Sequence, residues 1–200
     1  QGVSSAASDV YKRQDFNNAI LIRKNFPEAL SNLADLYRLK NNFTEARSLI
    51  NQAIKHNPNL AAAYNNLGVI ERDTENLNRA RTAFEKALTL DPALHQTELN
   101  LALVIDKIGD TASAIELVMK VIINHPQNAH AHNCLGTIYL NQNNLSEAEK
   151  SFKKSCSLQS GFAEANNNLA NTLLKKNKVK LALKYFNIAL DIDPKNPGFW

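Results

Sequence analysis

Residues 61–94 read AAAYNNLGVIERDTENLNRARTAFEKALTLDPAL, and the same pattern returns every 34 residues along most of the chain. Pro58, Pro92 and Pro126 show this interval directly, and Pro194 lies two further periods along. Self-similarity at a fixed interval of this size is the signature of a protein built from stacked repeats. The chain is therefore expected to contain repeats and to lack a single large core.

The period divides the chain into five complete units. These units are residues 27–60, 61–94, 95–128, 129–162 and 163–196. Numbered within a unit, position 7 is always leucine, position 8 is alanine or glycine, and position 20 is always alanine. Positions 4, 7, 8 and 11 form one helical stripe, and positions 17, 20, 24, 27 and 28 form a second. Each unit is thus predicted to be a pair of helices in an all-α fold.

The boundaries of the helices carry their own signals. Position 15 is asparagine or glycine in four of the five units, and these residues tolerate the left-handed conformation that ends a helix. Ser146 and Glu149 have the spacing of a capping box, which predicts that the second helix of its unit begins after Ser146. The proline at position 32 is expected to end the second helix.

These recurring residues resemble the tetratricopeptide repeat consensus, and the resemblance covers essentially everything from Asp15 onward. It implies tandem helix-turn-helix repeats stacked into a right-handed superhelix, an α-solenoid whose concave face is lined by the first helices. Ligand contacts in that family come mostly from positions 2, 5, 6, 9, 12 and 13. The chain departs from the consensus at position 4, which is aromatic only at Tyr64 and Trp200. Unit 95–128 is the most divergent.

The two ends of the sequence are expected to differ from the rest. Residues 4–14 read SSAASDVYKRQ, which resembles the translation of a transposon-based sequencing adapter. Residues 1–14 are therefore interpreted as a disordered artefact. Residues 15–26 are interpreted as the tail of a truncated repeat, and residues 197–200 as the start of another. This leaves the compartment unknown, with the cytoplasm as the default.

Composition limits the possible functions. The formal net charge is +4, and this modest excess spread over the chain argues against a nucleic-acid partner. The longest apolar run, Leu101 to Ile105, is far below the roughly 18 residues that a membrane-spanning helix needs, so no membrane insertion is expected. Cys134 and Cys156 form no disulfide framework.

A column of polar side chains marks the candidate site. Positions 5, 6 and 9 carry the predicted peptide-binding residues Asn32, Asn65, Asn66, Asn100, Asn133, Cys134, Asn167, Asn168 and Asn171. An amide donates and accepts hydrogen bonds, so such a column can bind the backbone of an extended peptide. It resembles the asparagine ladder in the repeat region of O-linked N-acetylglucosamine transferases. The alternative is that these residues have no selected role, because asparagine is frequent throughout this chain.

No chemistry of catalysis or of cofactor binding is predicted. His130 and Cys134 lie four residues apart on one helical face, but two ligands are too few for a structural zinc site. Gly-rich phosphate loops, nucleophile elbows and clustered carboxylates are missing from the sequence. The chain is therefore predicted not to be an enzyme, and it is predicted to bind neither a cofactor nor a metal.

The function predicted from the sequence is a scaffold that binds a protein or peptide along its concave face. The alternative is the substrate-recruiting arm of a larger enzyme, of glycosyltransferase or sulfotransferase type, whose catalytic domain lies outside these residues. That alternative depends on family analogy alone.

Overall fold

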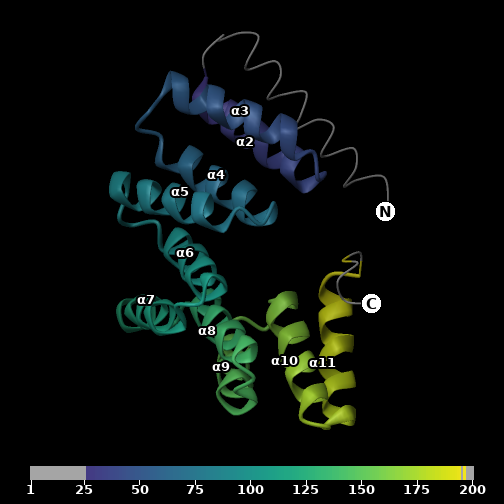
Figure 1. Ribbon diagram of the computed structural model, residues 1–200. Coiled ribbons are helices and arrows are strands. Elements are labelled where there is room, and N and C mark those ends of the chain that lie inside the picture. The colour runs from purple at the N-terminus through teal and green to yellow at the C-terminus, as the bar shows by residue number, and fades with distance from the viewer. Residues whose placement is uncertain (1–25, 195, 197–200) are drawn as a thin grey trace. The chain divides into compact units, whose positions relative to one another are not determined.

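The computed structural model describes residues 26–194 and 196, and this part of the chain consists of ten α-helices joined by short turns (Figure 1). The first helices of the pairs are α2 (Pro27–Leu39), α4 (Ala61–Asp73), α6 (His95–Ile108), α8 (Ala129–Asn141) and α10 (Ala163–Lys175). The second helices are α3 (Phe43–His56), α5 (Leu77–Leu90), α7 (Thr111–Asn124), α9 (Leu145–Leu158) and α11 (Val179–Ile192). The predicted all-α fold of paired helices is confirmed. The expected artefact at residues 1–14 and the truncated repeats at 15–26 and 197–200 lie outside the described residues, apart from Phe26.

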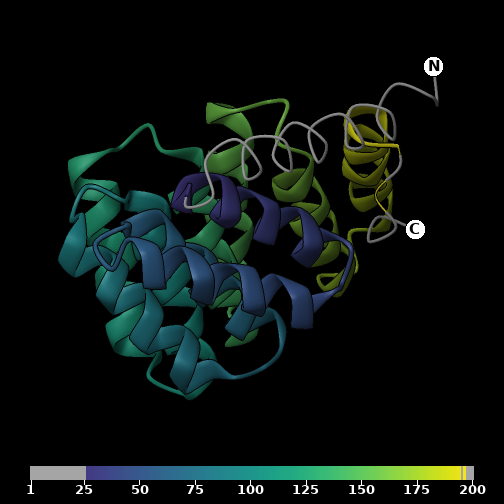
Figure 2. The ribbon, with the colours of Figure 1, turned by 90° about the horizontal axis from the view of Figure 1, so that it is seen from above.

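The helices belong to two compact units that divide within α6, after Val104. In the first unit, α2 packs against α3 and α4 against α5, and α4 also contacts both helices of the preceding pair (Figure 1). In the second unit, α8 pairs with α9, α7 packs on α8, and α9 packs on α10 (Figure 1). The pair of α10 and α11, at the yellow end of the colour scale, is seen again from above in Figure 2. In both units, one helix pair is stacked on the next.

Small residues at position 8 allow the two helices of a repeat to approach closely. A Cβ atom built on Gly68 would lie 2.5 Å from Cδ1 of Phe84, and one built on Gly136 would lie 2.6 Å from Cδ1 of Phe152. Both phenylalanine rings are completely buried. A glycine at position 8 is therefore required wherever position 24 carries a fully buried ring.

Where position 24 is smaller or less buried, position 8 carries alanine. Ala34 shares a core cluster with Ile50, and both side chains are fully buried. Ala170 occurs with Phe186, whose ring is only half-buried. The two positions are thus matched in size within each of these repeats.

The turn inside each repeat uses the left-handed conformation at position 15. Positive φ angles of 56° to 59° occur at Asn41, Asn143 and Asn177, and Gly109 has a φ of 107°. The prediction from asparagine and glycine at this position is confirmed. Glu75 takes the same conformation, with a φ of 58°, although its side chain is poorly suited to it.

The predicted capping box at Ser146 is wrong. The helix α9 begins at Leu145, and its N-cap is Asn144, whose Oδ1 accepts a hydrogen bond of 3.4 Å from the backbone N–H of Glu147. Because the left-handed residue at position 15 already reverses the chain, the next residue is placed to cap the helix. Asn42 caps α3 in the same way. Glu149 instead pairs with lysines.

Candidate functional site

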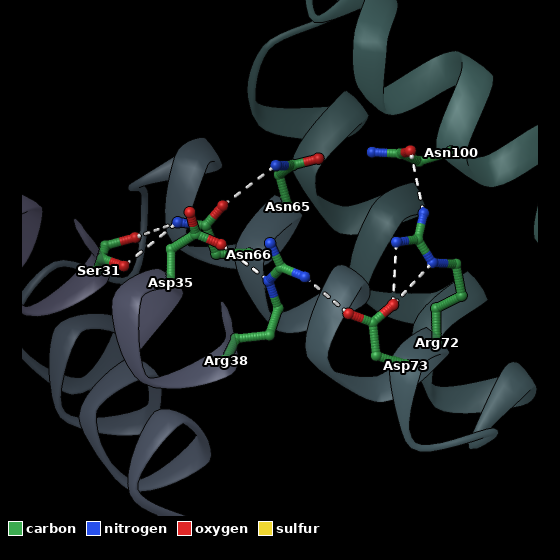
Figure 3. Close-up of polar contacts among 8 residues, drawn as sticks. All are labelled: Ser31, Asp35, Arg38, Asn65, Asn66, Arg72, Asp73 and Asn100. Carbon is green, nitrogen blue, oxygen red and sulfur yellow. Dashed lines mark hydrogen bonds and ion pairs between the residues drawn. The ribbon is translucent and has the colours of Figure 1, made fainter. Parts of the chain in front are cut away.

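In the first unit, the predicted asparagines lie on α2, α4 and α6, and those of α4 and α6 make hydrogen bonds to neighbouring repeats (Figure 3). Nδ2 of Asn66 donates to Oγ of Ser31 at 3.0 Å and to its carbonyl oxygen at 3.3 Å. Oδ1 of Asn66 accepts from Nδ2 of Asn65 at 3.2 Å, and Oδ1 of Asn65 accepts from Oγ1 of Thr97 at 2.9 Å. These amides therefore hold neighbouring first helices together.

A line of alternating charges lies beside these amides (Figure 3). Nε of Arg38 lies 2.8 Å from Oδ1 of Asp35, and its Nη1 lies 2.8 Å from Oδ2 of Asp73 on the next first helix. Nη2 of Arg72 lies 2.9 Å from Oδ1 of Asp73, while Nη1 of Arg72 donates to Oδ1 of Asn100 at 3.3 Å. Two arginines and two aspartates thus connect α2 to α4 and α6 with balanced charge.

The surroundings of Arg38 favour its charged form. Burial lowers the pKa of Arg38, but the hydrogen bonds to Asp35 and Asp73 outweigh that effect and leave the pKa raised overall. All four charged side chains keep partial access to water, between 19% and 43% of their area. Each pair is therefore expected to contribute at most about 1 kcal/mol, and its main effect is to fix the direction of the side chains.

In the second unit, the same kind of bond joins α8 to α10. Nδ2 of Asn168 donates to Oδ1 of Asn133 at 3.1 Å, and Nδ2 of Asn133 donates to Oε1 of Glu164 at 3.1 Å. Asn133 is buried and Asn168 is half-buried. Oδ1 of Asn167 is buried and has no hydrogen-bond partner among the described residues.

The bonds of the two units have one register. Ser31 with Asn66, and Asn133 with Asn168, each join position 5 of one repeat to position 6 of the next, 35 residues along the chain. We call Asn32, Asn65, Asn66 and Asn100 the amide strip of the first unit. Its counterpart in the second unit consists of Asn133, Asn167, Asn168 and Asn171.

Part of each strip remains available for a ligand. Asn32 on α2 is exposed and Asn171 on α10 is half-buried, and neither side chain has a hydrogen bond to another described residue. Asn100 uses its Oδ1 for Arg72, which leaves its amide N–H groups without a described acceptor. The strips therefore combine amides that hold the repeats together with amides that are open.

Cys134 interrupts the column as a core residue. Its side chain is only 4% exposed, and burial is the main cause of the raised pKa of its thiol, with Asp106 and Glu164 adding to the effect. A thiol kept protonated is a poor nucleophile and a poor metal ligand. The structure therefore places Cys134 beneath the surface, where a peptide would not reach its sulfur.

The nearby histidines are engaged locally. The ring of His130 lies 4.5 Å from the ring of Phe162, and Nε2 of His132 lies 3.2 Å from the carbonyl oxygen of Pro126. Over the described part of the chain, no three His, Cys, Asp or Glu side chains come close enough together to hold a metal ion. None of the helices described is long and apolar enough to cross a membrane.

Sequence reasoning selected the asparagines and missed the charges beside them. Asp35, Arg38, Arg72 and Asp73 occupy positions 9, 12 and 13, which the family resemblance already names as ligand-contact positions. The sequence did contain a signal for these residues, namely their opposite charges. Arginine and aspartate at these positions are spaced so that they can pair between consecutive repeats.

Comparisons with known proteins agree with this architecture. Three family models described as tetratricopeptide repeat match residues 31–95, 117–150 and 163–196, which together make up well over half of the chain. Among curated proteins, no sequence matches the chain.

Several solved structures share the fold. A thermophilic tetratricopeptide protein of Thermus thermophilus is 19% identical, with 87% of this chain and 95% of that chain covered and a TM-score of 0.78. The APC/C hetero-tetramer Cut9–Hcn1 gives 16% identity, a TM-score of 0.80, and coverage of 98% of this chain and 39% of that chain. YrrB is 24% identical, with coverage of 90% of this chain and 93% of that chain and a TM-score of 0.58.

At these identities, likeness to a solved structure establishes the fold and leaves the ligands open. The matches support tetratricopeptide repeats in general, and they do not support the finer resemblance to O-linked N-acetylglucosamine transferases.

Proposed function

The chain belongs to the tetratricopeptide repeat family, and we propose that its amide strips bind an extended peptide segment of a partner protein. Repeats of this family generally mediate interactions between proteins and are typically not catalytic. One similar protein, YrrB, is described as having an unusual peptide-binding site. The proposal assigns a peptide ligand to the first helices of this chain.

The observation that carries the proposal is the partial engagement of the amides. Asn66 and Asn168 are held by bonds to the preceding repeat, whereas Asn32, Asn171 and the amide N–H groups of Asn100 have no described partner. Side chains that are already ordered lose less entropy when a ligand binds. The held amides and the paired charges thus order the surface, and the open amides are free to bind a peptide backbone.

The chemistry of an amide suits an extended peptide. A peptide backbone presents N–H donors and C=O acceptors in alternation, and an asparagine side chain offers both functions in return. Recognition of this kind depends on the backbone of the ligand more than on its side chains. The expected partner is therefore a segment without fixed secondary structure, such as a tail or a linker.

The test separates the open amides from the held ones. Linear peptides selected from a random phage-displayed library against the native chain are measured by calorimetry against the triple variant Asn32→Ala, Asn100→Ala, Asn171→Ala. We expect this variant to bind at least about tenfold more weakly, which corresponds to about 1.4 kcal/mol. Its thermal unfolding should stay close to that of the native chain, because the bonds of Asn66 and Asn168 remain and the bond lost between described residues is the 3.3 Å contact of Arg72 with Asn100.

A matched control changes three exposed asparagines on second helices, Asn51, Asn124 and Asn187, to alanine. The control should bind the selected peptides as the native chain does. Equal affinity for all three proteins, or a library that yields no binder, contradicts the proposal.

A further inference from the structure

The lysines of this chain are concentrated in one part of the second unit. Between Lys150 and Leu190 the sequence contains eight lysines and a single acidic residue, Glu164. The net charge of +4 for the whole chain conceals this local excess, because acidic residues elsewhere compensate for it. An excess of this kind creates a positive surface potential that attracts anionic partners.

Three of the lysines converge on one carboxylate. Glu149 on α9 has a side chain only 9% exposed, and its oxygens lie 2.7 Å from Nζ of Lys153, 2.8 Å from Nζ of Lys176 and 3.1 Å from Nζ of Lys178. Lys153 is on the same helix, whereas Lys176 and Lys178 are in the turn between α10 and α11. The hydrogen bond from Lys153 is the largest cause of the lowered pKa of Glu149, which is about 2.

This arrangement contains more positive charge than Glu149 can balance. One lysine is enough to pair with a carboxylate, and each further ammonium group repels the first at short range. Three lysines around Glu149 leave a local excess of two positive charges. Lys150 lies on the same helix, with its Nζ 3.7 Å from Oε2 of Glu147 and a side chain that is 79% exposed, so four lysines face two carboxylates and the excess remains two positive charges. The need of Glu149 for a partner therefore does not explain why so many lysines surround it.

The surplus charge borders a shallow hollow of the surface. Ser146, Glu149, Lys150 and Lys153 line this hollow. Lys178 is 43% exposed and Lys153 is 51% exposed, so their ammonium groups keep donors available to a molecule in the solvent. We call Lys150, Lys153, Lys176 and Lys178 the lysine cluster.

We propose that the lysine cluster binds an acidic segment of a partner protein, as a second interaction surface distinct from the amide strips. The cluster lies on α9 and on the turn before α11, whereas the strip of this unit lies on α8 and α10. Carboxylates of an acidic segment would replace the missing negative charge and relieve the repulsion among the ammonium groups. The cluster contains neither the arginines nor the aromatic side chains that single-stranded nucleic-acid sites use for stacking, which favours a protein ligand.

The experiment measures binding of a labelled oligoglutamate peptide to the full chain at low and at moderate salt. Native protein should bind it in a salt-dependent manner and unfold at a higher temperature in its presence, and an oligoglutamine peptide of equal length should do neither. The variant Lys150→Ala, Lys153→Ala should bind at least about tenfold more weakly. The control variant Lys40→Ala, Lys55→Ala, with the same change in charge in the first unit, should bind like the native chain.

Several results would overturn the proposal. One is equal binding by the cluster variant and the control variant. Another is tighter binding of phosphatidylserine vesicles or of a single-stranded oligonucleotide than of oligoglutamate, because the ligand would then belong to a different class. A third is that Lys178→Gln lowers the unfolding temperature and leaves oligoglutamate binding unchanged, because the cluster would then serve only to stabilise the fold. The Asn32→Ala, Asn100→Ala, Asn171→Ala variant should retain oligoglutamate binding, which separates this result from the test of the peptide proposal.

Discussion

Arg47 on α3 and Glu71 on α4 form a two-point ion pair between the first two repeats, with Nε 2.7 Å from Oε1 and Nη2 3.1 Å from Oε2. The side chain of Glu71 is only 5% exposed, and Nδ2 of Asn76 donates to the same Oε2 at 3.0 Å. Glu71 occupies position 11, which carries a tyrosine in the repeats with Tyr37 and Tyr139. Within this repeat, a paired carboxylate therefore replaces the phenol ring.

Removing one partner of this pair should destabilise the first unit. The change Arg47→Met leaves the carboxylate of Glu71 buried with fewer donors, which is expected to lower the free energy of unfolding by about 1–3 kcal/mol. Urea denaturation followed by circular dichroism measures the loss. Adding Glu71→Tyr, the residue found at position 11 in two other repeats, should restore part of it.

The control for this pair is Arg81→Met. Arg81 pairs with Glu85 at 2.8 Å, but both side chains are about half exposed. Its loss should cost at most about 0.5 kcal/mol. A cost as large as that of Arg47→Met would show that burial of Glu71 is unimportant.

The contact between Gly68 and Phe84 predicts intolerance of a single methyl group. Gly68→Ala would place a Cβ atom 2.5 Å from the ring, which forces the ring or the helix to move and should cost about 1–3 kcal/mol. Gly161→Ala is the matched control, because a Cβ there would have no neighbour within 4 Å. The double change Gly68→Ala, Phe84→Ile reproduces the combination of the first repeat and should unfold at higher denaturant than Gly68→Ala alone.

The left-handed conformation of Glu75 predicts a stabilising substitution. Asparagine adopts a φ of 58° more readily than glutamate, so Glu75→Asn should raise the free energy of unfolding by about 0.5–1 kcal/mol. The reverse change at an equivalent turn, Asn143→Glu, should lower it by a similar amount. If both variants unfold at the native midpoint, backbone conformation does not limit stability at position 15.

Glu149 predicts a dependence of stability on pH. Its pKa is lowered to about 2 in the folded chain, first by the hydrogen bond from Lys153 and then by that from Lys176. An unfolded chain has a glutamate pKa of about 4.3, so folding favours the ionised form. The stabilisation is therefore complete above about pH 4.3 and is lost as the pH falls towards about 2.

This dependence is measured by urea denaturation at a series of pH values, for the native chain and for Glu149→Gln. The difference in stability between them should shrink as the pH is lowered from about 5 to about 2. The control Glu147→Gln removes a carboxylate that is 46% exposed and should follow the native curve. A constant difference between native and Glu149→Gln protein would contradict the assigned pairing.

The sequence predicted the helices well because their pattern follows from packing within one repeat. An alanine at position 20 must lie against the partner helix, and Ala46, Ala80, Ala114 and Ala148 are all fully buried. Four of the five left-handed turns were equally predictable, because few residues tolerate that backbone, whereas Glu75 gave no signal for the turn in its repeat. The cap of α9 was mispredicted, since both Asn144 and Ser146 are good caps and only the position of the turn decides between them.

The polar contacts between repeats could not be predicted in the same way. Whether Asn66 faces Ser31 depends on how far one helix pair is displaced along the next, and the pattern within one repeat does not contain that displacement. The pairing of Arg38 with Asp73 depends on the same displacement between helix pairs. The position of the asparagine column followed from the sequence, and its bonding required the structure.

The size match between positions 8 and 24 also bears on how such a gene can change. A crossover between the first two repeats that falls between these codons would join Ala34 to Phe84, or Gly68 to Ile50. The first product has a clash and the second a void, so both would fold less well than either parent. A crossover outside the codons between positions 8 and 24 leaves both residues from the same parent repeat. The pair is therefore expected to be inherited as a block, and the boundaries of past exchanges should avoid the codons between them.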